Sequence, residues 1–203
     1  MTVRLRLLVA LGILAMLPVA AAAQSKTTFG VKAGVNLANI SSPDQETSNR
    51  PGLVGGVVVG RQINDRFGVQ VEGLYSQQGA KDTTPGSGIE NLKYRVNYFS
   101  VPVLVRFGNT TTGETHLHLF TGPQAGFKLN AKATGNIGSV KLDEDINDLI
   151  KSTDFGWVIG ASVERHRLFF DARYTHGLTN FAKTAGDEGK NRTISLTAGI
   201  RLK

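Results

Sequence analysis

The sequence contains no cysteine, a single tryptophan and six prolines in 203 residues. Without cysteine, neither a disulfide bond nor a thiolate metal site can hold the fold, which must depend on hydrogen bonds and packing. Long apolar runs are also missing: beyond the first segment no stretch of 18 apolar residues occurs. This absence excludes a protein that crosses a membrane with helices. Hydrophobic residues still make up 40% of the chain, which argues against a disordered protein.

The first segment has the features of a cleavable export signal. Arg4 and Arg6 precede an apolar stretch, and three alanines stand directly before Gln24. We expect residues 1–23 to be a signal peptide that is removed, and residues 24–203 to form one domain. An N-terminal membrane anchor is the alternative, but the apolar stretch is shorter than the ~20 residues that span a bilayer.

The charge of the exported domain excludes a nucleic-acid function. The whole chain has a net charge of +7, and removing Arg4 and Arg6 lowers it to +5. No segment combines clustered lysine and arginine with aromatic residues, the pattern typical of nucleic-acid binding.

Apolar side chains alternate with glycine and polar side chains along most of the remaining sequence. In residues 29–37 one face carries Phe29, Val31, Ala33, Val35 and Leu37. A period of two predicts a strand with two different environments. The same alternation recurs in residues 67–76, 116–127, 154–163, 168–175 and 193–202. Six strands are thus predicted from alternation alone.

Two further segments predict strands of less regular pattern. Residues 53–61 are a valine and glycine run whose faces cannot be assigned. Residues 92–107 begin with Tyr94 and its alternate neighbours on one face and then change parity near Ser100. A β-bulge at that position would explain the change.

The connections between these eight strands alternate in length. Short turns are predicted at residues 63–65, 108–114 and 164–166, and long polar loops at residues 39–50, 79–91, 130–153 and 177–191. Short and long connections alternate when all long loops lie at one rim. The sequence therefore predicts a closed, antiparallel, up-and-down transmembrane β-barrel of about eight strands, with its short turns and both termini on the periplasmic side.

The nature of the polar faces favours a membrane barrel over a soluble ligand-binding barrel. They carry glycine, hydroxyl and amide residues and charges such as Asp171 and Arg173, which suit a narrow hydrogen-bonded lumen and not an apolar ligand cavity. Aromatic residues near the strand ends would form interfacial belts. These are Phe29, Phe67, Tyr75, Tyr94, Phe107, Phe127, Phe155 and Tyr174.

Several segments together resemble the PorT-like outer membrane β-barrel proteins. They are residues 29–36 (FGVKAGVN), 74–79 (LYSQQG), 101–104 (VPVL), 122–123 (GP) and 173–180 (RYTHGLTN). The resemblance covers nearly all of the predicted mature chain, and it rests on the order and spacing of the segments. It implies a barrel in the outer membrane of a Gram-negative bacterium, and only loosely a role in protein secretion.

The candidate sites have a structural interpretation and a functional one. Charges on the polar faces predict a buried network that closes the lumen, with proton or ion passage as the alternative. Its members would be Lys32, Glu72, Asp171, Arg173 and Arg201. His116 and His118 share a strand face but have no evident third metal ligand, and His176 near the outer rim has no nucleophile motif beside it.

The third long loop has apolar residues at helical spacing between acidic ones. Its apolar positions are Leu142, Ile146, Leu149 and Ile150, and its acidic residues are Asp143, Glu144, Asp145 and Asp148. This spacing predicts a short amphipathic helix packed on the rim. A partner or a divalent cation on the acidic cluster is the alternative, although the glycine of a calcium loop is missing.

We therefore expect a non-enzymatic outer-membrane barrel that acts as a structural or interaction component, with no catalytic, cofactor or metal residue assigned. Its expected partners are outer-membrane lipids and a protein bound through the external loops, with no nucleic acid, and the expected state is a monomer. Two alternatives stay open: an outer-membrane lipid-modifying enzyme using His176 and a loop hydroxyl, and a soluble ligand-binding barrel.

Overall fold

The computed structural model describes residues 27–41, 47–82, 90–112, 114–137, 140–180 and 189–202. These residues form strands β1 (Thr27–Ser41), β2 (Thr47–Gln62), β3 (Phe67–Asp82), β4 (Glu90–Thr112), β5 (Thr115–Ile137), β6 (Val140–Asp145), β7 (Thr153–Arg165), β8 (Leu168–Asn180) and β9 (Lys190–Arg201). None of the described residues forms a helix long and apolar enough to cross a bilayer. The predicted signal peptide, residues 1–23, lies outside the described residues.

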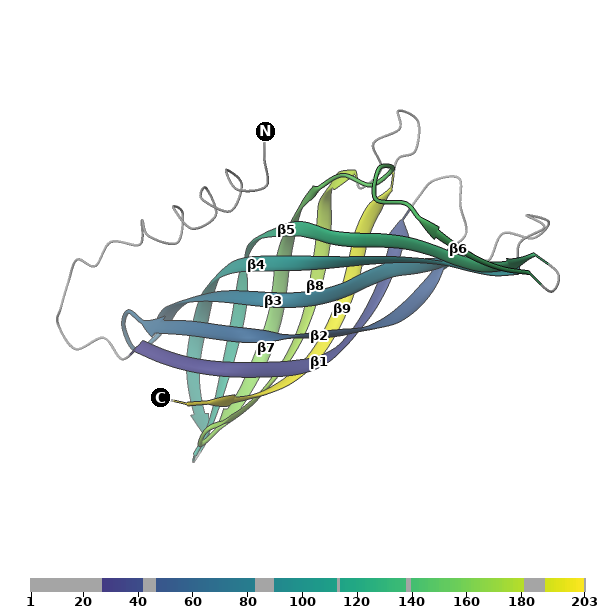
Figure 1. Cartoon of the computed structure of the whole chain (residues 1–203). Coiled ribbons are helices and arrows are strands. Elements are labelled where there is room, and N and C mark those ends of the chain that lie inside the picture. Colours follow the sequence, from purple (N-terminus) through teal and green to yellow (C-terminus); the bar gives the residue numbers. More distant parts are fainter. Residues whose placement is uncertain are drawn as a thin grey trace.

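Eight of the strands close into an antiparallel barrel. The strand order is β4-β3-β2-β1-β9-β8-β7-β5, and pairing of β4 with β5 completes the ring. Figure 1 shows the barrel wall, with β6 beyond one end of it and the described ends of β1 and β9 side by side at the other. The prediction of a closed, up-and-down barrel of eight strands is confirmed, and β6 is an addition to it.

The alternation of apolar and polar residues in the sequence corresponds to the outer and inner faces of the barrel wall. Most apolar side chains of these strands point outward, and Leu53 and Ile159 each expose 60% of their surface. The inward positions hold polar residues that are almost fully buried, such as Asn36 and Glu72. This arrangement suits a barrel in lipid, and it is the reverse of a soluble ligand-binding barrel.

Aromatic side chains mark two levels of the outer face. Phe67 and Phe107 lie edge to face on β3 and β4 near the short turns, with ring centroids 5.4 Å apart. Tyr75 and Phe99 lie opposite each other on the same two strands, nearer the long loops. Phe67 and Tyr75 are separated by about 26 Å along the strand and about 20 Å along a barrel axis tilted by 40°. Such a height is close to the apolar band of outer-membrane barrels.

The β-bulge that we predicted in β4 near Ser100 does not lie in that strand. Tyr98, Ser100 and Leu104 all face inward and are buried, so β4 keeps one parity along this stretch. The extra residue lies in the neighbouring strand, because Asn97 pairs with Asn130 and Tyr98 with Lys128. In the half of β4 near the long loops, the inward side chains are apolar, as in Val96 and Tyr98, whereas elsewhere the outward side chains are apolar. This exchange of apolar and polar faces looks like a change of parity in the sequence.

Several predicted loops are partly strand. Residues 79–82, 90–91 and 130–137 continue β3, β4 and β5 outward, and residues 109–112 continue β4 toward its short turn. The helix predicted in the third loop is absent: residues 140–145 form β6, which pairs with β5 from Ile137↔Val140 to Lys132↔Asp145. Residues 140–145 form backbone hydrogen bonds with the open edge of β5, and this pairing is favoured over the helix that the spacing of the apolar residues predicts.

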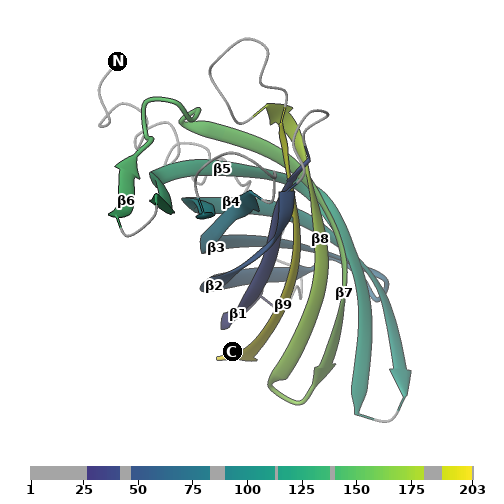
Figure 2. The ribbon, with the colours of Figure 1, turned by 90° about the vertical axis from the view of Figure 1, so that its right-hand side faces the viewer.

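Three strands of the wall therefore continue past the rim that carries the long loops, and β6 is added to their edge. We call this part the external extension: it consists of residues 79–82 of β3, 90–97 of β4, 130–137 of β5 and the whole of β6. Beyond Phe127 the edge of β5 pairs with β6 and no longer with β7. Figure 2 shows β6 standing apart from β7 and β8.

The inner face of the external extension has a small apolar core. Ile150 is 4% exposed and packs with Val96, Tyr98 and Ala131, and Ile146 covers the same cluster. Lys128 holds the connection in place, because its Nζ atom donates to the carbonyl oxygens of residues 147 and 150. The apolar residues between β6 and β7 thus pack on the wall, as we predicted. The segment forms a turn there and not the predicted helix.

Candidate functional site: charged clusters in the lumen

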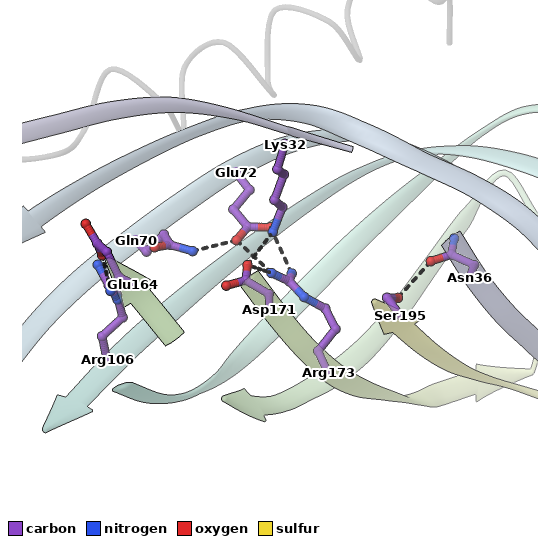
Figure 3. A network of polar contacts seen from close by, with 9 residues as sticks. All are labelled: Lys32, Asn36, Gln70, Glu72, Arg106, Glu164, Asp171, Arg173 and Ser195. Atoms are coloured by element: carbon purple, nitrogen blue, oxygen red, sulfur yellow. Dashed lines mark hydrogen bonds and ion pairs between the residues drawn. The ribbon is translucent and has the colours of Figure 1, made fainter. Parts of the chain in front are cut away.

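Four charged side chains meet inside the barrel, and we call Lys32, Glu72, Asp171 and Arg173 the lumen network. Lys32 Nζ lies 2.7 Å from Glu72 Oε2 and 3.2 Å from Asp171 Oδ2. Arg173 donates hydrogen bonds of 2.8 and 3.0 Å to Glu72 and one of 3.1 Å to Asp171. Figure 3 shows the four side chains pointing toward one another. The predicted buried charge network is confirmed for these residues.

The lumen network joins opposite sides of the wall. Lys32 belongs to β1, Glu72 to β3, and Asp171 and Arg173 to β8. In the strand order, β3 and β8 are four strands apart in a ring of eight, so the pair of Glu72 and Arg173 spans the lumen. All four side chains are between 0% and 3% exposed. The network therefore closes the middle of the barrel.

The charges of the lumen network balance, with two cations and two carboxylates. Burial of an ion costs several kcal/mol unless partners and hydrogen bonds compensate for the lost water. Gln70 supplies one such bond, since its Nε2 donates to Glu72 Oε1 at 2.6 Å. The guanidinium of Arg173 also lies over the ring of Phe120, 5.0 Å from its centroid. Such a balanced set is costly to break at any single member.

A second charged cluster lies nearer the end of the barrel that carries the short turns. Arg201 donates its Nε proton to Glu164 and a further hydrogen bond of 2.8 Å to Thr28. Arg106 lies 3.5 Å from the same carboxylate, and His118 lies 4.0 Å from it. Arg201 is buried in an ion pair, as predicted, but its partner is Glu164, and it does not contact the lumen network. Sequence reasoning missed Glu164, which it had placed in a turn.

The outer half of the lumen contains two small cavities above the lumen network. Gln78, Ser100, Gln124, Thr175 and Thr193 line both of them. Each leaves about 10 Å³ for the centres of water molecules, which is room for about one. The Ser100 hydroxyl has no hydrogen-bond partner among the described residues, although the side chain is buried. This part of the lumen suits single waters and not a larger solute.

The histidines singled out in the sequence lie in two places. His116 and His118 face the same side of β5, as predicted, with stacked rings 6.4 Å apart. One ring nitrogen of His118 is 2.7 Å from the carbonyl oxygen of Gly108. His176 faces outward from β8, where its Nδ1 atom lies 3.4 Å from the hydroxyl of Tyr174. Among the described residues, no group of three or more potential ligands could hold a metal ion.

One family model matches most of the sequence. The family model described as "Outer membrane protein beta-barrel domain" matches residues 22–183. No curated protein sequence matches the chain.

Solved structures that resemble the chain do so at low sequence identity. The attachment invasion locus protein Ail of Yersinia pestis is 17% identical, with a TM-score of 0.48, over 87% of this chain and 99% of Ail. Neisserial surface protein A is 15% identical, with a TM-score of 0.49, over 86% and 98% of the two chains. OprG from Pseudomonas aeruginosa is 10% identical, with a TM-score of 0.48, over 88% and 97%. By the match of its sequence to the family model, the chain belongs to the outer membrane protein beta-barrel domain family, whose description indicates the outer membrane as its location.

Proposed function

We propose that this protein is a non-enzymatic outer-membrane barrel that acts as a structural or interaction component, with a lumen that does not conduct. The observation that carries the proposal is the lumen network, in which Arg173 reaches across the barrel to Glu72 with both side chains almost fully buried. An eight-stranded barrel is just wide enough for its own side chains. An ion could pass only by separating these charges.

The external extension is the proposed binding site for a protein partner. It continues the wall beyond the apolar band, and its end strand β6 carries the exposed acidic residues Asp143, Glu144 and Asp145. Surface elements held by a rigid barrel are suitable places for binding, because the scaffold fixes their position. The resemblance to PorT-like proteins suggests a component of protein secretion as the partner, bound by a monomeric barrel.

Conductance in planar lipid bilayers tests the closed lumen. We expect the purified wild-type protein to give no steady ohmic current, and the Glu72→Ala/Asp171→Ala variant to give measurable current if it remains folded. A steady current through the wild type would contradict the proposal.

Co-purification in mild detergent tests the interaction role. A variant in which a short turn replaces residues 138–145 should keep the heat-modifiable mobility of a folded barrel and lose protein partners that co-purify with the wild type. Hydrolysis of outer-membrane lipid by the wild type, abolished in His176→Ala, would show instead that the barrel is an enzyme.

A further inference from the structure

The outer face of the external extension carries basic side chains that lie directly opposite one another. In the pairing of β3 with β4, Lys81 is opposite Lys93, and both belong to the face on which Tyr75 and Phe99 point outward. In the pairing of β4 with β5, Arg95 is opposite Lys132. We call Lys81, Lys93 and Arg95 the basic patch.

The basic patch lacks compensating charge within the described part of the chain. Lys132 forms an ion pair with Asp143, at 3.4 Å, where both side chains are at least half exposed. No such pair is formed by Lys81, Lys93 or Arg95 with any described carboxylate. Like charges placed directly opposite each other on a sheet destabilise it. An anion on this face would remove that repulsion.

The position of the basic patch identifies the kind of anion. Arg95 is four residues beyond Phe99 on β4, which is about 13 Å along the strand and about 10 Å along the barrel axis. A headgroup layer adds about 5–8 Å on each side of a hydrocarbon core of about 30 Å. Long basic side chains extend toward the charged layer while their stems cover apolar surface. Lys81 and Lys93 are six residues beyond Tyr75 and Phe99, which is about 20 Å along the strand and about 15 Å along the axis. Arg95 thus lies nearest the headgroup layer, and the long side chains of Lys81 and Lys93 reach back toward it from the side of the long loops.

We propose that the basic patch binds the phosphate groups of the phosphorylated glycolipid in the external leaflet. The guanidinium of Arg95 can hold two phosphate oxygens at once, and Lys81 and Lys93 supply point charges beside it. The inference rests on the proposed placement of the barrel with its long loops outward. It adds a defined lipid to the proposed interaction role.

Titration with lipid A tests this inference. The folded protein in nanodiscs of phosphatidylcholine would be titrated with lipid A that carries its two phosphates, and with the same lipid after dephosphorylation. Each lysine or arginine near an anionic surface contributes roughly a fivefold gain in binding. We therefore expect Lys81→Gln/Lys93→Gln/Arg95→Gln to weaken binding of the phosphorylated lipid on the order of 100-fold.

A matched control removes charge at the opposite end of the barrel. Arg165 ends β7, Arg167 lies in the turn that follows, and both are exposed, so Arg165→Gln/Arg167→Gln should bind lipid A as the wild type does. Equal binding of dephosphorylated lipid A, or equal losses in the control and the patch variant, would overturn the inference. Heat-modifiable mobility shows that each variant is folded. Because the conductance and co-purification tests do not involve this patch, failure here would leave the proposed function standing.

Discussion

Replacing Arg173 by methionine should leave two buried carboxylates, Glu72 and Asp171, facing Lys32 alone. The substitution removes three hydrogen bonds of 2.8–3.1 Å and the contact of the guanidinium with the ring of Phe120. Methionine fills most of the volume, so the change isolates charge from packing. The lumen network would pass from balanced charge to a net charge of −1 in a site whose side chains are at most 3% exposed.

The expected cost follows from the burial of the network. Removing one partner of a buried ion pair typically destabilises a protein by about 3–5 kcal/mol, because the other charge stays buried without compensation. The double substitution Glu72→Met/Arg173→Met restores the balance, since Lys32 and Asp171 remain 3.2 Å apart. Replacement of a whole buried pair by apolar residues is often nearly neutral. We therefore expect the double variant to recover most of the stability that the single variant loses.

Urea unfolding in detergent micelles measures both effects. Trp157 is the only tryptophan and is half exposed on the outer face, so its fluorescence reports the transfer from amphiphile to water. The midpoint and slope give the free energy of unfolding for the wild type and for each variant. A loss below about 1 kcal/mol for Arg173→Met would refute the reasoning, as would a double variant no more stable than the single one.

Three other substitutions, one of them with a control, test the packing and the orientation of the wall. A Cβ atom at Gly199 would lie 2.2 Å from the ring of Phe169, so Gly199→Ala should cost about 1–3 kcal/mol of unfolding free energy, whereas Gly73→Ala, whose nearest contact is 3.5 Å, should cost little. Ile150→Ala should destabilise the core of the external extension by about 2–5 kcal/mol, measured as faster proteolytic cleavage there while the barrel stays folded. Leu196→Arg should lower the free energy of unfolding in lipid vesicles by about 2–4 kcal/mol, and an unchanged value would contradict a lipid-facing β9.

The sequence determined the eight strands of the barrel and their order, and in the six regular strands it determined which residues share a face. Alternation requires only that each strand has one apolar and one polar side, and a transmembrane wall imposes that difference at every position. The lumen network was predictable for the same reason, since Lys32, Glu72, Asp171 and Arg173 all stand at inward positions of regular strands. Charged side chains enclosed in a narrow lumen form ion pairs, because an unpaired buried charge is costly.

Only the tertiary structure decided what happens where the environment changes along a strand. The inward side chains of Val96 and Tyr98 pack against Ile150 because β4 continues into the external extension, where the segment after β6 covers it. β6 is a strand because the edge of β5 beyond Phe127 is left without β7 as a neighbour. Arg201 pairs with Glu164 because the register of distant strands, and not the spacing along the chain, sets which charges meet. Such choices depend on neighbours far away in the sequence, and alternation carries no information about them.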